Sequence, residues 1–285
     1  MVTNISQNMH GKICMVTGAN SGVGKAIALG LARLGATLVI VCRVQGKGEA
    51  ARAEIVAQSG NSPVVLMIAD LSVLVSVRKL AEEFKSQFPK LDVLVNNAAT
   101  VKFTRTLTPD GFETMFATNH LAPFLLTNLL LDSLQASGEA RVLNITAPST
   151  VRLNFDDLQS ERRFSSLTTF GASKMGNLLF TFELARRLAG RGVVVNAIHP
   201  GLVKSNLMRE APAPMRWFTN LMSAKSEHAA DMIVRVATAP EFAGESGHFY
   251  RDGKEIKADA FALDPENQQR LWQVSAELAK LNVQT

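Results

Sequence analysis

Short apolar runs alternate along the chain with longer segments of helical periodicity. The runs are apolar at successive positions and rich in β-branched residues, which is typical of strands buried on both faces of a parallel sheet. They predict strands over Ile13–Val16, Thr37–Val41, Val64–Ile68, Val93–Val95, Arg141–Ile145 and Val193–Ile198. The amphipathic segments between them predict helices over Gly24–Leu34, Gly48–Gln58, Leu74–Gln87 and Phe112–Leu134. Strand then helix, repeated, indicates right-handed βαβ units and hence a doubly wound α/β fold with a parallel sheet.

This alternation continues along the chain without a break. No Pro- or Ser-rich linker interrupts it, and no repeat with a period of about 20 to 50 residues is visible. We therefore expect residues 1–285 to form a single Rossmann-type domain. Trp272 is interpreted as a core residue or as the anchor of a C-terminal helix.

The composition narrows the function classes. Hydrophobic residues make up 47% of the 285 positions and charged residues 19%, which excludes a disordered chain. The net charge is only +5 and no run of five like charges occurs, so a nucleic-acid partner is not expected. Cys14 and Cys42 cannot form a disulfide framework, and they fit either a reducing compartment or a simple role in filling the core. No metal site is expected.

Targeting and membrane segments are not expected either. The N-terminus, Met1–His10, is polar and lacks the apolar region of a secretory signal. The most apolar run, Leu121–Leu131, contains Thr127 and Asn128 and is shorter than the ~18 residues that a membrane span needs. We therefore expect a cytoplasmic protein with no integral membrane segment.

A glycine-rich turn joins the first predicted strand to the first helix. It reads TGANSGVGK from Thr17, with the spacing G-x-x-x-G-x-G. Glycines at such a turn let the backbone approach a pyrophosphate, whose charge is then stabilised at the helix N-terminus. A tight turn without a ligand would need glycine too, but the position directly after the first strand favours a dinucleotide site. The predicted contacts are Gly18, Asn20, Ser21, Gly22, Val23 and Gly24.

The end of the second strand indicates which dinucleotide is bound. Sites that prefer NAD place an acidic residue here against the ribose hydroxyls, yet this chain has no acid before Glu49. It carries Arg43 and Lys47 instead, and an arginine can fork onto a 2′-phosphate and stack on adenine. We therefore predict NADP(H) over the alternative, in which Arg43 merely ends a strand in solvent. Further cofactor contacts are expected from Asp70, Leu71, Asn97, Ala98 and Ala99.

Several motifs link the chain to a known family. TGANSGVGK, ADLS, VNNAA, TNHLAPF and HPGLVKSNL resemble the short-chain dehydrogenase/reductase family, in order and at family spacing, from about Gly11 to Leu281. Within it, FDDLQSERRF, ASKMGNLLFTFELARRL and GHFYRDGKEIK are similar to the branch of retinol dehydrogenases and protochlorophyllide reductases. The HPGLVKSNL motif implies further cofactor contacts from Pro200, Gly201, Val203 and Ser205. The resemblance leaves a homo-oligomer open, because helices matching residues 112–134 and 169–188 pair between subunits in many relatives.

The resemblance also implies four catalytic positions, two of which lack the family residue. The family's asparagine matches Asn119 and its lysine matches Lys174. Its tyrosine position is Phe170, and its serine position, in the segment NITA, is Ala147. The phenol protonates the alkoxide left by hydride transfer, typically worth ~10²–10⁴-fold, and a lost oxyanion donor costs a further ~10²–10³-fold. We therefore expect this chain to be a poor dehydrogenase.

Three explanations of the missing hydroxyls stay open. One is a natural family member that uses NADP(H) with other acid chemistry or with none. A structural role is favoured for each neighbouring polar residue, and Ser149 is the foremost of them as a substitute donor. The second is an NADP(H)-binding pseudoenzyme with a regulatory role. The third is deliberate removal, because Tyr→Phe and Ser→Ala are the least disruptive deletions of these hydroxyls. A non-redox isomerase or cyclase on the same fold is the alternative enzyme class.

Residues 202–225 are expected to form a substrate lid, as this stretch does in the family. It contains Met215, Trp217, Phe218 and Met222 among prolines, an adaptable apolar wall that suits an apolar small molecule. A helix stripe facing the core would show the same spacing, and a weak membrane contact is a third interpretation. We expect an NADP(H)-dependent oxidoreductase of an apolar carbonyl or alcohol, in which Lys174 holds the ribose hydroxyls.

Overall fold

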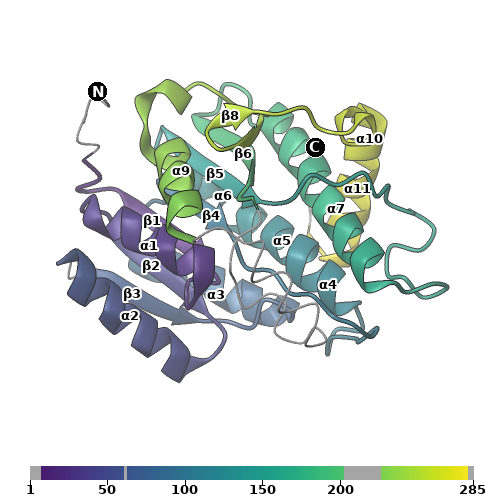
Figure 1. The fold of residues 1–285 in the computed structure, drawn as a ribbon, viewed down its shortest axis with the longest axis horizontal. Coiled ribbons are helices and arrows are strands. Elements are labelled where there is room, and N and C mark those ends of the chain that lie inside the picture. The colour runs from purple at the N-terminus through teal and green to yellow at the C-terminus, as the bar shows by residue number, and fades with distance from the viewer. Residues whose placement is uncertain (1–7, 61–62, 202–225, 282–285) are drawn as a thin grey trace.

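A single sheet runs through the centre of the computed structural model, which describes residues 8–60, 63–201 and 226–281 (Figure 1). Within these ranges, eight strands are ordered β3-β2-β1-β4-β5-β6-β7-β8, and only the β7–β8 pair is antiparallel. They are β1 Ile13–Thr17, β2 Thr37–Cys42, β3 Val64–Ile68, β4 Val93–Asn96, β5 Ala140–Ile145, β6 Val193–His199, β7 Phe249–Arg251 and β8 Lys254–Glu255. The predicted α/β class and all six predicted strands are confirmed.

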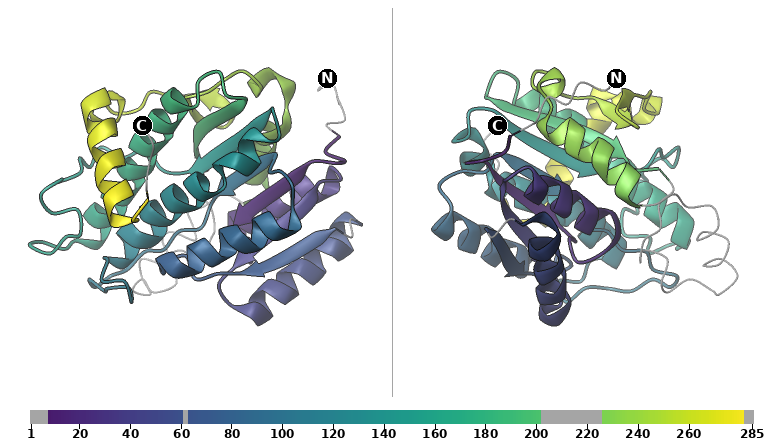
Figure 2. Two further views of the ribbon diagram at one scale, coloured as in Figure 1. Left: turned by 180° about the vertical axis from the view of Figure 1, so that it is seen from behind. Right: turned by 60° about the vertical axis from the view of Figure 1, so that its left-hand side comes forward.

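Helices cover both faces of the sheet, which confirms the doubly wound arrangement. One face carries α1 (Gly22–Arg33), α2 (Gln45–Ser59) and α9 (Ser226–Thr238). The other carries α3 (Leu74–Gln87), α5 (Ala122–Leu129) and α7 (Ser166–Arg187), seen from behind in Figure 2. The remaining helical segments of the described residues are α4 (Thr114–Phe116), η1 (Ala117–Leu121), α6 (Leu131–Gln135), η3 (Pro240–Phe242), α10 (Ala260–Leu263) and α11 (Pro265–Leu278).

Alternate strand positions supply two separate core layers. In β1, Met15 faces the layer under α3, α5 and α7, while Cys14 and Val16 face the layer under α1 and α9. Burial on both faces explains why the strands read as continuous apolar runs. Because β2 and β3 lie on one side of β1 and β4 to β6 on the other, the strand order reverses between β1 and β4. Doubly wound sheets open a ligand crevice at this point, outside the carboxyl ends of the strands.

The continuous helix predicted over Phe112–Leu134 is wrong, because the structure divides it. The Glu113 carboxylate accepts hydrogen bonds from two backbone N–H groups of α4, at 3.0 and 2.7 Å, and so starts a new helix. The next turn, η1, is a π-turn in which the N–H of Ala122 donates to the carbonyl of Ala117. Such turns occur often at functional sites, and this one carries Asn119.

The C-terminal helix α11 lies against α5 and α7. Trp272 packs edge-on against Phe124 of α5, with ring centroids 5.0 Å apart, and stacks on Phe180 of α7 at 6.1 Å. Arg187 lies 4.4 Å from the centroid of the Trp272 ring. The interpretation of Trp272 as a helix anchor is confirmed. Every residue from 173 to 181 is buried, so the middle of α7 has no exposed face.

Candidate active site

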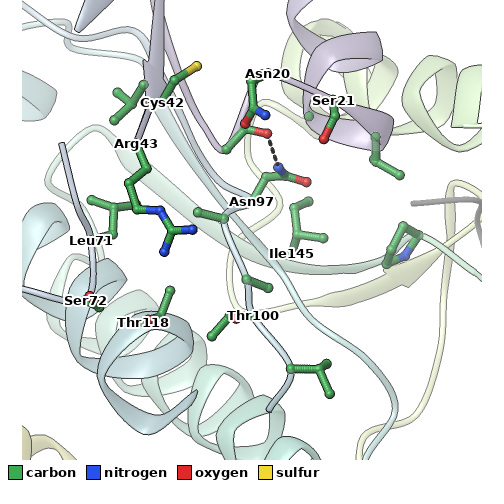
Figure 3. Close-up of a pocket in the computed structure, with 18 of the residues that line it drawn as sticks. Asn20, Ser21, Cys42, Arg43, Leu71, Ser72, Asn97, Thr100, Thr118 and Ile145 are labelled. Atoms are coloured by element: carbon green, nitrogen blue, oxygen red, sulfur yellow. Dashed lines mark hydrogen bonds between the residues drawn. The ribbon is translucent and has the colours of Figure 1, made fainter. Parts of the chain in front are cut away.

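A cleft of about 780 Å³ opens at the carboxyl ends of the strands, where the strand order reverses (Figure 3). Its volume is within the range of small-molecule sites. Most residues predicted for cofactor binding and catalysis line it: Gly18, Asn20, Ser21, Val23, Gly24, Arg43, Lys47, Asp70, Leu71, Asn97, Ala98, Ala99, Ala147, Phe170, Lys174, Pro200 and Gly201. Gly22 and Asn119 are not among the lining residues. Val203, Ser205 and the predicted lid at 202–225 lie outside the described residues.

The glycine-rich turn is packed too closely for side chains. At Gly18, a Cβ would lie 2.9 Å from the Cα of Ala98, and the backbone has a φ of +67° that favours glycine. At Gly24, a Cβ would lie 2.5 Å from the carbonyl oxygen of Gly18. The turn therefore presents bare backbone to the cleft, which is what the close approach of a phosphate requires.

The N-terminus of α1 is suited to an anion. Ser21, which precedes the helix, makes no side-chain capping bond, and the first turn holds no acidic side chain. Free N–H groups and the helix dipole both favour negative charge there. Asn97 fixes the turn from β4, because its Nδ2 donates to the Thr17 carbonyl and its N–H to Thr17 Oγ1, each at 2.9 Å. The residues present fit the pyrophosphate of a dinucleotide.

Two cations line the cleft on the β2 side. Arg43 follows β2 and its side chain reaches into the cleft (Figure 3), while Lys47 lies in the first turn of α2. The carboxylate of Glu54, also in the lining, is paired with Lys25 at 2.8 Å. The hydrogen bond from Lys25 lowers the pKa of Glu54. The cations of Arg43 and Lys47 therefore face the cleft, and no carboxylate of the described residues is bonded to either, as recognition of a phosphate requires.

Lys174 is held at the β5 side of the cleft by two hydrogen bonds. Its Nζ donates to the carbonyl oxygen of Ile145 at 3.1 Å, and its own carbonyl accepts from Thr146 Oγ1 at 2.9 Å. The residue is 5% exposed, and its Nζ lies 5.5 Å from the centroid of the Phe170 ring. Burial lowers the pKa of Lys174 to about 8, because the charged form is desolvated.

The side chain of Asn119 joins the segment after β4 to α7 behind the cleft. Its amide oxygen accepts from the N–H of Thr100 at 2.8 Å, and its Nδ2 donates to the Thr100 carbonyl and to Ser173 Oγ, each at 3.0 Å. Ser173 Oγ donates in turn to the carbonyl of Phe170 at 2.7 Å. The predicted asparagine is thus linked to position 170 through α7, with its amide fully engaged.

Ala147 and Phe170 line the same side of the cleft, and neither brings a hydroxyl. The neighbouring hydroxyls are engaged elsewhere, since Thr146 donates to the Lys174 carbonyl and Ser149 to the Gly171 carbonyl at 2.8 Å. Ser149, the substitute considered from the sequence, is tied to the start of α7 and is not among the lining residues.

Several lining residues were not predicted. His199 ends β6, and its Nδ1 has no hydrogen-bond partner among the described residues. Burial and the nearby Arg251 lower the pKa of His199. Thr100, Lys102 and Thr118 also line the cleft. Each lies within three positions of a predicted site residue along the chain, and this proximity is the only sequence feature that indicates a place in the cleft.

No helix in the described parts of the chain is long and apolar enough to cross a bilayer. The same residues hold no group of three or more His, Cys, Asp and Glu side chains that could bind a metal ion.

Comparison with known proteins places the chain in a family. The sequence profile of the short chain dehydrogenase family matches residues 12–216. The chain belongs to the short-chain dehydrogenase family. Retinol dehydrogenase 12 of Mus musculus is 41% identical over 281 residues, which cover 97% of this chain and 88% of that protein. Retinol dehydrogenase 13 of Homo sapiens is 40% identical over 286 residues, which cover 95% and 85%.

Solved structures share the fold. An uncharacterised protein from Mycobacterium paratuberculosis superposes with a TM-score of 0.80 at 31% identity, covering 98% of this chain and 97% of that one. A metagenomic short-chain oxidoreductase in complex with NADP gives 0.65 at 25% identity, covering 85% and 98%. Membership in the short-chain dehydrogenase family, an oxidoreductase family, confirms the resemblance drawn from the motifs.

Proposed function

We propose that the protein is an NADP(H)-dependent oxidoreductase that acts on an apolar carbonyl or alcohol. One observation carries the proposal: a single cleft has the cations Arg43 and Lys47 on its β2 side and Lys174 beside Ala147 and Phe170 on its β5 side. Two comparisons support it, since retinol dehydrogenases are relatives and a protein of similar fold binds NADP.

In this proposal the bound cofactor supplies or accepts a hydride at its nicotinamide, and the protein positions both reactants. Arg43 and Lys47 hold the 2′-phosphate, and the turn from Gly18 to Gly24 holds the pyrophosphate. Lys174 donates to the ribose hydroxyls. The proposal keeps residues 1–285 as one cytoplasmic domain with 202–225 as its lid.

The proposal also assigns Ala147 and Phe170 to the positions where the family's serine and tyrosine act. Both would then flank the reacting oxygen without offering a hydroxyl. Turnover is therefore slower than in a relative that keeps the phenol, because proton transfer from a positioned acid contributes about 10²–10⁴-fold.

The missing hydroxyls favour a second candidate, in which the chain is a non-redox isomerase or cyclase, or a regulatory protein that binds NADP(H). An assay that follows both the nicotinamide and the organic product distinguishes these functions. Product formed without loss of NADPH indicates the isomerase or cyclase. NADPH binding with no product from any substrate indicates the regulatory protein.

We expect the double change Ala147→Ser and Phe170→Tyr to raise the hydride-transfer rate by at least about 100-fold, because it supplies a proton donor and an oxyanion donor. Phe170→Tyr should account for most of the gain, and the two gains should not be additive, as is usual for residues that act as a unit. The measurement is the change in NADPH absorbance with apolar aldehydes and ketones, and with polycyclic alcohols in the reverse direction.

Phe88→Tyr, at the residue that follows α3, is the matched control, because it adds a phenol outside the residues that line the cleft. Its turnover should equal that of the unchanged protein. A double variant that binds NADPH yet transfers no hydride to any substrate would contradict the redox proposal and leave the second candidate ahead.

A further inference from the structure

The β5 side of the cleft combines one buried ammonium with a lack of available hydroxyls. Ala147 and Phe170 have none, and Thr146 donates its hydroxyl to a carbonyl of α7. The titratable side chains that line this side from β6 and α7 are His199 and Lys174. Among the described residues, only these two groups on this side could give a proton to a substrate oxygen held here, and water is the remaining source.

Lys174 is fixed in place. Its Nζ donates to the carbonyl of Ile145, the last residue of β5, and its backbone carbonyl accepts from Oγ1 of the next residue, Thr146. Hydrogen bonds therefore fix both the backbone and the side-chain end of Lys174 to the end of β5. Preorganisation of this kind keeps a donor at one position during a reaction, so little reorganisation is needed.

The Lys174 ammonium has more N–H donors than it has acceptors among the described residues. It carries three N–H bonds, and the Ile145 carbonyl is its only hydrogen-bond partner among the described residues. The Phe170 ring, 5.5 Å away, can stabilise the charge but cannot take a proton. Two N–H bonds are left for molecules in the cleft, which is enough for one ribose hydroxyl and one substrate oxygen.

The acidity of the group suits such a role. A general acid is most effective when its pKa lies near the working pH, and burial brings the pKa of Lys174 to about 8. Burial and Arg251 lower the pKa of His199 from 6.5, so its ring is mostly neutral near pH 7. Lys102, in the segment after β4, is the other titratable group in the neighbouring lining.

We propose that Lys174 is the general acid of this site and gives its proton directly to the substrate oxygen, in place of a phenol. The inference rests on the proposed function. As the carbonyl carbon accepts a hydride from the reduced nicotinamide, the N–H bond of Nζ breaks and an O–H bond forms on the substrate. The neutral amine keeps its hydrogen bond to Ile145 and regains a proton from water.

The first test needs no substrate. The ¹³Cε signals of lysine-labelled, cofactor-free protein are followed by NMR from pH 6 to pH 11, and the Lys174 signal is assigned by its absence in Lys174→Arg. We expect a midpoint near pH 8, well below the value of about 10.4 for an exposed lysine. A midpoint above about 10 would overturn the proposal, because such a group resembles an unperturbed lysine and is a poor acid near neutral pH.

The second test compares Lys174→Arg in two backgrounds. Arginine keeps the positive charge but holds its proton too tightly to act as an acid. In the present chain we expect NADPH affinity to change by less than about threefold and kcat to fall by about 100-fold or more. In the Phe170→Tyr background the phenol is the acid, so the same change should cost less than about tenfold. Equal losses in both backgrounds would overturn the proposal.

Two controls keep the second test interpretable. Lys90→Arg is the matched swap, because Lys90 pairs with Asp92 and does not line the cleft, and it should leave kcat unchanged. The kcat profile of the unchanged chain should fall above pH 8, and Lys102→Met should keep that alkaline limb. A profile that stays flat up to pH 10 would contradict the proposal even if Lys174→Arg failed to fold.

The outcomes separate this proposal from the proposed function. If the present chain transfers hydride but loses the same factor to Lys174→Arg in both backgrounds, Lys174 is not the acid and the proposed function stands. If neither the present chain nor Phe170→Tyr transfers hydride to any substrate, the proposed function fails and the acid role fails with it.

Discussion

Arg43 is the side chain on which the predicted preference for NADP(H) over NAD(H) chiefly depends. It lies at the end of β2, where an NAD site would carry an acid, and its guanidinium reaches into the cleft (Figure 3). A guanidinium can hold a phosphate through two parallel hydrogen bonds, which a lysine ammonium cannot do. Lys47 therefore adds charge, whereas Arg43 adds charge and geometry.

We predict that Arg43→Ala weakens NADPH binding by about 10- to 100-fold, which corresponds to the loss of about 1.5 to 3 kcal/mol for hydrogen bonds to a charged group. NADH has no 2′-phosphate, so its affinity should change by less than about threefold. Fluorescence titration of both cofactors measures the two effects. Arg52→Ala, an exposed arginine of α2 that does not line the cleft, is the control. Equal affinities for NADPH and NADH in the unchanged protein would contradict the prediction.

Residues next to strand ends were predictable, and couplings between distant residues were not. Gly18, Arg43 and Asn97 follow strands directly, so the local pattern placed them at the sheet edge that forms the cleft. The bond from Thr146 to Lys174 joins positions 28 apart and depends on where α7 lies beside β5. No periodicity carries that information, and only the family resemblance pointed to Lys174.

Elements with a full period of pattern were predicted closely, whereas those shaped by tertiary contacts were not. The bounds of β3 and α3 agree with the prediction residue for residue. The long helix over 112–134 failed because the Glu113 carboxylate, fully buried, caps α4 and because η1 adds a residue to one turn. The hairpin strands β7 and β8 span three and two residues, too few for a periodicity to appear.

His120 of η1 connects this irregular element to α11. Its ring lies among Phe116, Phe124 and Phe180, and its Nε2 lies 2.7 Å from the hydroxyl oxygen of Ser275. Burial lowers the pKa of His120 from 6.5 to about 4, because this environment disfavours the charged ring. The folded protein therefore requires the neutral form.

This requirement makes stability fall with acidity over a defined window. The unfolded chain takes up a proton at His120 below pH 6.5 and the folded chain only near pH 4, so the stabilisation is complete above pH 6.5 and is lost as the pH falls toward 4. Between pH 7.5 and pH 4.5 we expect His120 to account for about 2.5 kcal/mol of lost unfolding free energy. Urea unfolding at the two pH values measures it.

The corresponding variants are His120→Gln and, as a control, His228→Gln at an exposed site on α9. His120→Gln should be less stable at pH 7.5 but should lose about 2.5 kcal/mol less on acidification than the unchanged protein. The control should lose as much unfolding free energy between pH 7.5 and pH 4.5 as the unchanged protein does. A His120→Gln variant with the full acid loss would show that other groups cause it.

At the scale of the whole molecule, α11 covers the surface through which the family resemblance implies that subunits could pair. The resemblance left a homo-oligomer open through the helices at 112–134 and 169–188. In this structure α11 packs on α7, Trp272 contacts both α5 and α7, and residues 173–181 are buried within the single chain. A second copy could reach this surface only by displacing α11.

We predict that the protein does not dimerise through α5 and α7 and has the mass of one chain at micromolar concentration. Size-exclusion chromatography with light scattering measures the mass. Trp272→Ala should lower the unfolding free energy by about 3 to 5 kcal/mol, the usual cost of deleting a buried large aromatic side chain. A dimer whose cross-links map to α5 and α7 of two chains would refute the prediction.

Because α11 follows α5 and α7 in the sequence, it is synthesised after the surface that it covers. A ribosome adds about 5 to 20 residues per second, and domains begin to fold from the N-terminal side. Phe124 and Phe180 thus emerge long before Trp272, which covers them in the finished fold. Until α11 is released, the nascent chain carries an uncovered aromatic face of the kind that chaperones bind. A transcript truncated before the codon for Pro265 would make that exposure permanent.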